Sequence, residues 1–415
     1  MLGRSRFRSR ARFLGSGAIP ALSLNFLTGT LDPRITFTRS TTATFVGSNG
    51  LIQSAAINAP RFDYNPGTLA AIGLLIEEAR TNLMLQSEDF ATTWASVGAT
   101  ITTNTTVAPD GATTGDTIAA STTASYVRQA VTFTGDGSKS YSVFVKAGTA
   151  TASRLVLRDT TPTAVNRGGV NLTWTAGVPS GVATDGGTLE GIDAYPNGWY
   201  RVRAVATGVV AANANEFRFS PDTAVGTNNT IFWGAQTENG AFATSYIPTT
   251  TAQVTRTADI AVMTGTNFSS WYNASEGTFV ATFEASPNTF TTYVAASNGV
   301  VAQNSMHMDN DGAGNMRAAY YSGSVAVALL GLGAVGTIGA VNKMASAYRL
   351  NDFAASRNGG AVVTDTLGAV PVGVVQLNIG ADPSGAATNV SNTHIRSIAY
   401  YNTRLPNTQL QVLSA

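Results

Sequence analysis

The stretch IFWGAQTENGAFATSYIPTT, residues 231–250, decides the fold expected of this chain. Bulky apolar residues alternate with small or polar ones up to the Thr237–Glu238–Asn239–Gly240 corner, and an extended segment follows it. Period-two alternation around an Asn-Gly pair is a strong indication of a β-hairpin. Pro248 then ends the pairing, because proline cannot donate a hydrogen bond to a neighbouring strand. The stretch predicts the last strand pair of one β-sandwich and the start of the next.

Short alternating runs on both sides of this stretch point the same way. Before it, NEFRFS at 215–220 places Phe217 and Phe219 on one face and Glu216 and Arg218 on the other. After it, GTFVATFEAS and THIRSIAYYNTRL repeat the pattern. Gly, Asn, Asp or Pro bound these runs, and no helical pattern separates them, which is typical of antiparallel sandwiches. The sequence therefore predicts an all-β protein with two antiparallel β-sandwiches, jelly-roll or lectin-like, in tandem.

We expect four parts along the chain. Residues 1–20 form a basic docking peptide, 21–88 a β-rich segment for oligomerisation or attachment, 89–250 a jelly roll and 251–415 a second sandwich. The segment 21–88 consists of short extended runs with too little apolar sequence to close a core by itself. Neighbouring subunits around a symmetry axis commonly complete strand segments of that kind. The sequence therefore predicts a homo-oligomer.

The composition excludes several classes of function. The chain has 415 residues, of which only 12% are charged, about half the usual share. Its net charge of +1 gives no global field toward nucleic acid, and it has no cysteine for a disulfide or a thiolate site. The two histidines, His307 and His394, are far apart in the sequence, and no G-x-S-x-G nucleophile motif is present. We expect no catalytic residue, no metal site and no enzymatic activity.

The N-terminus alternates arginine with small or apolar residues. In an extended strand the guanidinium groups would project from one face. Arginine binds carboxylates and phosphates bidentately, so the pattern predicts a strand that docks on an acidic surface, with phenylalanines as anchors. A solvated basic tail and a secretory signal are the alternatives. The residues of the expected docking strand are Arg4, Arg6, Phe7, Arg8, Arg10, Arg12 and Phe13.

Aromatic residues beside turns are the candidates for sugar binding, because a flat ring stacks on the apolar face of a pyranose. Trp174 and Tyr195 lie next to Gly- and Pro-containing turns, and we assign glycan binding to them. Trp199 and Trp233 lie inside alternating strands, where we expect them to fill the core.

Two further stretches each allow a functional and a purely structural interpretation. Asp309–Asn310–Asp311–Gly312 could begin a calcium loop, but Tyr320 stands where such a loop needs a glutamate. A polar turn is the preferred interpretation, with Ca²⁺ as the alternative and no other cofactor expected. The run 325–341 has Thr337 as its one polar side chain, but glycines interrupt it, so we expect a buried strand and loop and no membrane span.

Several strings resemble a family of tailed-phage virion proteins. They include RFDYNPGTLAAIGLLIEEARTNLMLQSEDF at 61–90 and IFWGAQTENGAFATSYIPTTTAQVTRTAD at 231–259. The middle module of that family is similar to carbohydrate-binding jelly rolls. The C-terminal half, with MASAYRLNDFAASRNGGAVVTD at 344–365, resembles concanavalin A-like (laminin G-like) sandwiches. The resemblance covers nearly the whole chain after residue 20.

The resemblance implies a structural component of a phage particle, a head fibre, spike or tail fibre. Its N-terminus would dock on other virion proteins of the capsid, neck or tail, and its lectin-like domains would adhere to host cell-surface polysaccharide. Fibres of this family imply a homotrimer, located in the virion, without nucleic acid as a partner. No catalytic motif of the family maps onto this chain. A polysaccharide-degrading tail spike enzyme and a purely structural capsid or neck decoration protein are the alternatives.

Overall fold

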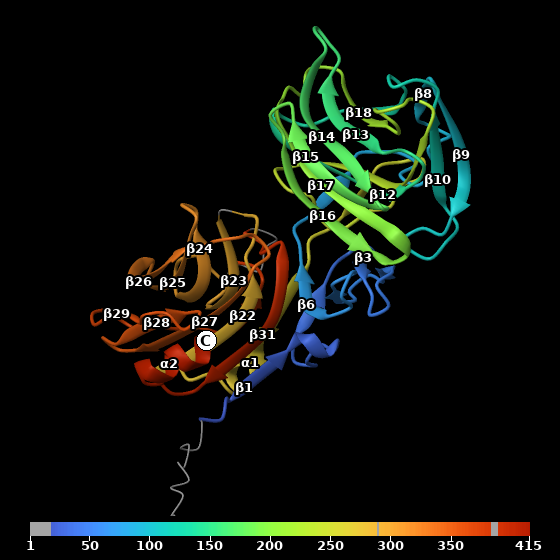
Figure 1. Cartoon of the computed structure of the whole chain (residues 1–415). Helices are drawn as coiled ribbons and strands as arrows, with labels where there is room; N and C mark the ends of the chain where they lie inside the picture. Colours follow the sequence, from blue (N-terminus) through green and yellow to red (C-terminus); the bar gives the residue numbers. More distant parts are fainter. Residues whose placement is uncertain (1–17, 289, 383–388) are drawn as a thin grey trace, which may run out of the picture.

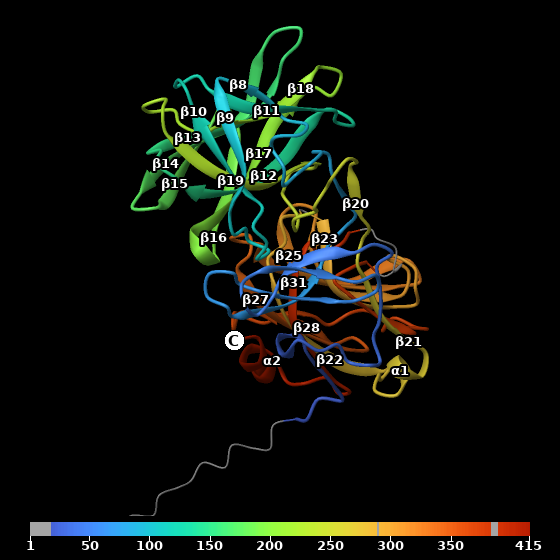
Figure 2. The same ribbon diagram turned by 90° about the vertical axis from the view of Figure 1, so that its right-hand side faces the viewer.

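The structure is a computed structural model, and it describes residues 18–288, 290–382 and 389–415. Nearly all of its regular elements are strands, and the strands form two sandwich-like bodies, a jelly roll and a second sandwich (Figure 1). A view turned by 90° shows the jelly roll above the second sandwich, with the N-terminal segment between and beside them (Figure 2). The all-β prediction is confirmed.

The jelly roll consists of two six-stranded antiparallel sheets. The first, the β12 sheet, has the order β16 (Thr188–Tyr195), β17 (Trp199–Val209), β12 (Gly137–Ala147), β19 (Asn229–Asn239), β10 (Gly115–Ala120) and β9 (Ala99–Thr106). The second, the β13 sheet, has the order β15 (Val178–Thr184), β14 (Val165–Thr175), β13 (Ala152–Asp159), β18 (Asn215–Ser220), β11 (Tyr126–Val131) and β8 (Ala95–Val97). Phe217, Phe219 and Phe232 fill the core between the two sheets, as the alternation predicts.

The second sandwich also has two sheets. The β22 sheet has the order β29 (Val363–Asp365), β28 (Phe353–Arg357), β27 (Val341–Arg349), β22 (Glu276–Glu284), β31 (Thr393–Tyr401), β6 (Ala71–Ile76) and β5 (Arg61–Tyr64), with β1 (Leu22–Asn25) also on β31. The β23 sheet has the order β2 (Thr36–Thr38), β21 (Ile260–Thr264), β30 (Gln376–Ile379), β23 (Phe290–Ser297), β24 (Ser305–Asp311), β25 (Asn315–Ser322) and β26 (Val325–Ala334). The helical elements are short: η1 (Phe26–Thr28), η2 (Pro196–Gly198), α1 (Gly265–Ser269) and α2 (Asn407–Ser414).

Strands from the N-terminal segment complete the second sandwich. β1 and β6 lie end to end along β31, with Leu22 opposite Tyr400 and Ile76 opposite Thr393. β2 pairs with β21 in the other sheet, where Phe37 lies opposite Ala261. The segment thus finds its core within its own chain, and its incompleteness no longer argues for an oligomer. The expected boundaries 1–20, 21–88, 89–250 and 251–415 stay a prediction about folding units.

The segment after β19 does not form the expected hairpin. β12 occupies one edge of β19. On the other edge β10 pairs with Asn229–Phe232, Leu83 N donates to Thr237 O and Ala235 N donates to Ser87 O, so a returning strand has no edge to pair with. Side chains of β19 hold the return segment instead. The Gln236 amide accepts a hydrogen bond from Ile247 N at 2.7 Å and donates to Ser245 O at 3.2 Å. The Glu238 carboxylate accepts from the amide and hydroxyl of Thr244.

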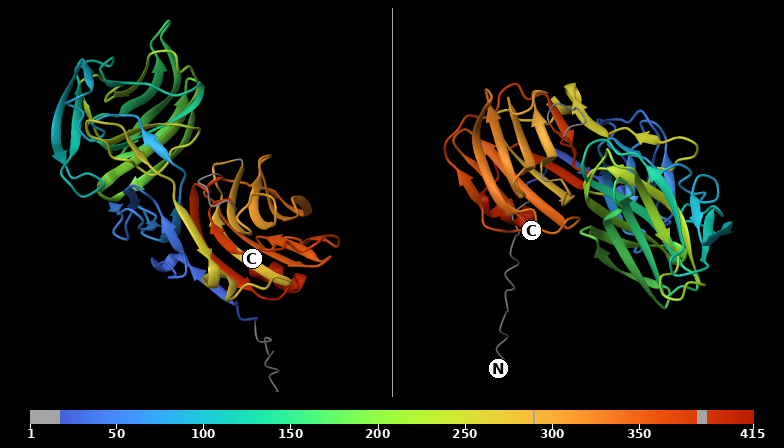
Figure 3. Two further views of the ribbon diagram at one scale, coloured as in Figure 1. Left: turned by 180° about the vertical axis from the view of Figure 1, so that it is seen from behind. Right: turned by 90° about the horizontal axis from the view of Figure 1, so that it is seen from above.

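Two short strands connect the jelly roll to the second sandwich. β7 (Arg80–Asn82) leads into the jelly roll, β20 (Val254–Arg256) leads out of it, and the two pair antiparallel. A hairpin of β3 (Ala43–Val46) and β4 (Ile52–Ala55) covers the outer face of the β12 sheet. There Ile52 packs with Trp199, Trp233 and Tyr246. Views from behind and from above show the N-terminal segment at this junction (Figure 3).

A buried ionic cluster lies where these segments meet. Asp259 accepts from Arg39 at 3.0 Å and from Arg61, and all three side chains are inaccessible to solvent. Glu77 accepts from Arg61 at 2.7 Å and forms an ion pair with Arg256 at 2.8 Å. Burial alone would raise the pKa of Glu77, but Arg256 and Arg61 outweigh it and hold that pKa well below its ordinary value. The cluster is therefore charged at neutral pH, and each charge has a partner.

The strings that carry the phage-family resemblance form this junction. Glu77, in EEARTNL, also accepts from the amide and hydroxyl of Ser245, in TSYIPT, both at 2.7 Å. Asn82 donates to Ala235 O at 3.0 Å and to Ile247 O at 2.8 Å. These polar residues thus connect the N-terminal segment, the end of the jelly roll and the start of the second sandwich.

Candidate functional site

A polar groove opens in the jelly roll just beyond the junction. Its volume is ≈ 410 Å³, within the range of ligand-binding clefts. Three stretches build it: the segment after β7, the β9–β10 region and the return segment at Thr249 and Thr250. Ala91 is the one residue of its lining without a polar side chain. The lining residues are Gln86, Glu88, Asp89, Ala91, Thr103, Asn104, Thr114, Asp116, Thr249 and Thr250.

Backbone hydrogen bonds fix the walls of the groove. The buried carboxylate of Asp116 accepts from Phe90 N and from Asn104 N, both at 2.9 Å, and so joins two walls. Gln86 N donates to Thr250 O at 2.7 Å and joins the third wall to the first. Both oxygens of Asp116 are therefore used for structure. The hydroxyls, amides and remaining carboxyls of the groove are presented on a rigid frame.

Glu88 is the titratable group of the groove with a strongly shifted pKa. Burial raises the pKa of Glu88 to about 6, and a hydrogen bond from the Tyr246 hydroxyl at 2.9 Å opposes that shift. Asp110 adds a further rise through charge repulsion. The Tyr246 hydroxyl also contacts Ser87 Oγ at 2.7 Å, which orients the ring behind the groove. Near neutral pH this carboxyl can exchange a proton, so it can either accept or donate a hydrogen bond.

The two aromatic residues assigned to glycan binding lie away from the groove and in different sheets. Trp174, in β14, is 7% exposed, packs in the jelly-roll core and donates from Nε1 to Ser153 Oγ at 2.9 Å. Tyr195, at the end of β16, packs edge-on against Phe144 with ring centroids 5.1 Å apart. The burial of Trp174 leaves no open ring face for a sugar to stack on. The structure does not bring these two residues together.

The other sequence-based assignments divide between described and undescribed residues. Arg4, Arg6, Phe7, Arg8, Arg10, Arg12 and Phe13, the expected docking strand, lie outside the described residues. Trp199 and Trp233 are at most 1% exposed, so both are buried as expected, although they pack between the β12 sheet and β4.

The carboxylates considered for calcium are engaged elsewhere. Asp309 is paired with Arg317 at 2.8 Å, and Asp311 accepts from Ala313 N and Asn315 N at the turn. Within residues 18–288, 290–382 and 389–415, no three His, Asp or Glu side chains are grouped to hold a metal ion.

His394 bridges two carboxylates of the second sandwich. Its Nδ1 lies 2.7 Å from Glu284 Oε2 on β22, and its Nε2 lies 3.0 Å from Asp63 Oδ2 on β5. Burial would lower the pKa of His394, but Glu284 and Asp63 raise it to about 10. The imidazole is therefore charged at neutral pH and ties the N-terminal segment to β22.

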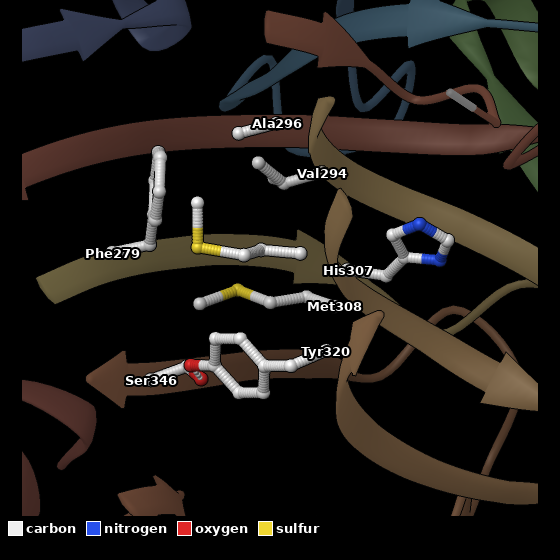
Figure 4. A pocket seen from close by; sticks show the side chains of 8 residues that line it. Phe279, Val294, Ala296, His307, Met308, Tyr320 and Ser346 are labelled. Atoms are coloured by element: carbon white, nitrogen blue, oxygen red, sulfur yellow. Dashed lines mark hydrogen bonds between the residues drawn. The ribbon is translucent and has the colours of Figure 1, made fainter. Parts of the chain in front are cut away.

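A second, much smaller cavity lies inside the second sandwich (Figure 4). Its volume is ≈ 10 Å³, about that of one water molecule, and Met306, Met308 and Phe279 line it. Its polar wall is the hydrogen-bonded pair of Tyr320 and Ser346. His307 projects from the opposite face of β24 (Figure 4). This cavity is a packing defect of the core and too small for a ligand.

No protein-family model matches the chain, and no curated protein matches it. Among solved structures, the NanB sialidase of Streptococcus pneumoniae (K499G mutant) is 14% identical, with a TM-score of 0.32, over 36% of this chain and 26% of that one. The CBM40 of Ruminococcus gnavus IT-sialidase, bound to α2,6-sialyllactose, is 17% identical, with a TM-score of 0.30. The match covers 34% of this chain and 85% of that one. The leech intramolecular trans-sialidase is 15% identical, with a TM-score of 0.30. The match covers 34% of this chain and 23% of that one.

These likenesses concern the lectin-like β-sandwich fold of about a third of the chain. The matched part spans only about a quarter of the two full sialidases. The expectation that the chain is not an enzyme is corrected here, because the similar structures include sialidases. At these identities and TM-scores the likenesses assign no activity to this chain.

No helix among the described residues is long and apolar enough to cross a membrane. The strand expected at the start of the 325–341 run is β26, but it is an edge strand in which only Ala328 and Leu330 are buried, so the expected burial is wrong for most of it.

Sequence reasoning missed the groove because its residues are individually unremarkable polar side chains. Thr103 and Asn104 come from one strand, whereas Thr249 and Thr250 follow about 145 residues later. The Ser87–Glu88–Asp89 run was the one visible feature, and its acidic character suggests a helix start. In the structure this run forms turns, because Asp116 captures Phe90 N.

Proposed function

We propose that this protein is a glycan-binding adhesin and that the polar groove of the jelly roll is its binding site. The observation that carries the proposal is a cleft of ≈ 410 Å³ whose lining is almost entirely hydroxyl, amide and carboxyl side chains. A saccharide presents many hydroxyl groups, each of which both donates and accepts hydrogen bonds. Such a lining matches that chemistry better than it matches an apolar ligand.

The rigid frame of the groove supports the same proposal. Asp116 uses both oxygens to fix the walls, so little conformational entropy is lost when a ligand binds. Thr103 and Thr250 place exposed hydroxyls on opposite walls. Glu88, with its pKa of about 6, can accept a hydrogen bond from a sugar hydroxyl once it is ionised.

A glycan array of host polysaccharides tests the binding. Thr103→Val and Thr250→Val each remove one hydroxyl while keeping the shape, and each should weaken binding about tenfold. Thr175→Val, at an exposed site at the end of β14, is the matched control and should bind as the wild type does. Equal binding by all three variants would place the glycan elsewhere on the molecule.

The phage context is the second element of the proposal, and the family strings support it. We infer a head fibre, spike or tail fibre whose N-terminus joins a capsid, neck or tail protein of the virion and whose sandwiches face host polysaccharide. Deleting residues 1–13 should leave folded protein that no longer joins particles, and high salt should weaken attachment of the full chain. Normal incorporation of the truncated protein would contradict the docking role.

A homotrimer is part of the same proposal and rests on the family resemblance alone. Mass measurement in solution tests it directly. A stable monomer of 42.9 kDa would contradict it.

A second candidate function is polysaccharide cleavage in the same groove, and the state of Glu88 favours it. A glycosidase needs a carboxyl that stays protonated near neutral pH to act as general acid, and burial gives Glu88 a pKa of about 6. Release of reducing ends from host polysaccharide is the measurement. Cleavage by this route should fall as pH rises through about 6 and vanish in Glu88→Gln, while glycan binding persists. Unchanged cleavage in that variant would exclude Glu88 as the acid.

A further inference from the structure

The outer face of the β13 sheet gathers four arginines. Phe217 and Phe219 of β18 face the core, so Glu216 and Arg218 of the same strand face outward. Residues directly opposite each other in neighbouring strands share a face. Arg128 of β11 lies opposite Arg218, and Arg158 of β13 lies opposite Glu216.

Arg154 of β13 lies opposite Ser220, in the next outward row. This row, with Arg128, Arg158 and Arg218, completes the set that we call the arginine face. The four side chains are between 17% and 43% exposed, so a large ligand can reach them.

The carboxylates nearby do not balance these charges. Glu216, only 2% exposed, is paired with Arg128 at 2.6 Å and with Arg218. Arg154 is paired with Asp185 at 2.5 Å. Four guanidinium groups thus face two carboxylates, which leaves two positive charges on this face of a chain whose total net charge is +1.

Arg158 is the arginine with the weakest pairing. Its Nε lies 3.8 Å from Glu216 Oε1, which is beyond hydrogen-bond distance. It donates no hydrogen bond to any residue in the described part of the chain, and its buried Nε has no partner there. The Nε atoms of Arg128 and Arg154 are also buried without a partner among the described residues. Arg128 and Arg218, which lie directly opposite each other, share the single carboxylate of Glu216.

The surface beside these arginines is partly covered by side chains. The row through Arg128 and Arg218 continues over Val156 and Gly169, both of which are buried, and the side chains of Thr184 and Asp185 lie over Gly169. Farther along, Thr173 and Val182 are exposed. The outer face of the other jelly-roll sheet is covered by the β3–β4 hairpin, whereas the four arginines of the β13 sheet are partly exposed.

We propose that the arginine face is a second binding site, specific for acidic polysaccharide, in which guanidinium groups bind the carboxylates of successive sugar units. Arginine suits this ligand because its planar fork matches a carboxylate bidentately. Two positive charges that the nearby carboxylates do not balance favour an anionic partner. The site lies on a different sheet from the groove and does not depend on the ligand of the groove.

Single-stranded nucleic acid is the competing anionic polymer. Its binding surfaces combine positive charge with exposed aromatic rings on which bases stack. On the arginine face the ring of Tyr126 lies beneath the guanidinium of Arg218, with 4.1 Å between Cζ and the ring centroid. This ring is already occupied, so the face favours a saccharide.

Calorimetric titration of the full-length protein tests the proposal with two forms of one ligand. The probe is a short oligogalacturonate, and its control is the same oligomer with every carboxylate methyl-esterified. The acid should bind and the ester should not, and binding of the acid should be lost in about 1 M salt. Equal binding of acid and ester would overturn the proposal. Tighter binding of single-stranded DNA than of the acid would also overturn it.

Matched variants locate the site. Arg158→Gln removes the least-paired guanidinium and should weaken binding of the acid roughly tenfold or more. Arg128→Gln combined with Arg158→Gln should abolish it. Arg349→Gln, on β27 of the other sandwich and 56% exposed, carries the same charge change and should bind as the wild type does. If Arg158→Gln and Arg349→Gln bind equally, the arginine face is not the site.

Failure of this inference can be told apart from failure of the proposed function. Thr103→Val, in the groove, should leave binding of the acid unchanged and weaken binding of array glycans. Loss of acid binding in Thr103→Val would assign the acid to the groove and end the proposal of a second site. Array binding without acid binding would leave the groove proposal standing and overturn only this one.

Discussion

His394 of β31 gives the second sandwich a pH-dependent contact with β5 and β22. Asp63 and Glu284 raise the pKa of His394 to about 10, above the ordinary value of about 6.5. Folding therefore favours the charged imidazole of His394. The charged imidazole contributes fully to the free energy of unfolding below about pH 6.5, and this contribution is lost as the pH rises through about 10.

His394→Gln removes this contribution. It should lower the free energy of unfolding by about 1.5–3 kcal/mol at neutral pH, because the half-buried Asp63 loses its cation while Glu284 keeps only Arg396. Urea denaturation at about pH 6, 8 and 10 measures the difference in the free energy of unfolding between wild type and variant. This difference should become smaller as the pH rises. A difference that stays constant over this range would contradict the charged bridge.

Asp259 is the central carboxylate of the buried cluster at the junction. Asp259→Asn leaves Arg39 without its carboxylate and Arg61 with Glu77 alone. We expect a loss of about 3–5 kcal/mol in the free energy of unfolding. Asp32→Asn, which removes a partly exposed pair with Arg34, is the control and should cost at most about 1 kcal/mol. Equal losses would mean that the junction is not held by charge.

At the residue scale, the sequence predicts burial better than it predicts function. Alternation correctly placed Trp199 and Trp233 inside, because a strand buries every second side chain. The same argument could not place Trp174, whose neighbouring turn suggested exposure. Nor could it find Glu88, since burial and Tyr246 set its pKa, and both come from contacts distant in the sequence.

At the scale of single elements, the return segment after β19 is held by side chains and not by a β-ladder. Gln236→Ala removes both amide bonds to this segment and should cost about 1–3 kcal/mol locally. Hydrogen exchange of the Ile247 amide should accelerate in this variant, while exchange in β12 stays slow. Gln409→Ala, on the exposed face of α2, is the control and should leave Ile247 unchanged. Unaltered exchange at Ile247 in Gln236→Ala would refute this attachment.

The failed hairpin shows what an element-level pattern can and cannot predict. β19 itself is predictable, because its alternation is local. Whether the next segment can pair depends on which edges of β19 are free, and β10 and β12 are distant in the sequence. The short C-terminal helix α2 needs no such information, because its backbone hydrogen bonds join residues close in the sequence.

At the scale of the whole molecule, the jelly roll is inserted into the second sandwich through β7 and β20. Asn82 lies directly opposite Val254, so a two-residue Asn-Gly turn can join them in place of residues 83–253. We expect the shortened chain to fold with a cooperative transition and β-type circular dichroism.

The variant to compare with the shortened chain lacks residues 1–76. This deletion removes β1, β2, β5 and β6 from the two sheets of the second sandwich. That deletion should abolish folding, because Leu22, Leu24 and Ile76 belong to the sandwich core. A folded product of the deletion, or an unfolded product of the excision, would contradict this organisation. No sequence pattern reveals this organisation of the second sandwich, since its paired strands β1 and β31 are separated by most of the chain.

The paired connection of β7 and β20 also determines how the molecule responds to mechanical force. A pull on the jelly roll away from the second sandwich stretches both connecting strands in the same direction, so the tension divides between two peptide chains. It then passes into β6 on one side and β21 on the other, which belong to different sheets. β6 is anchored on β31, and β21 is anchored between β2 and β30. The load therefore acts along strands in both layers of the sandwich, where rows of hydrogen bonds must break together.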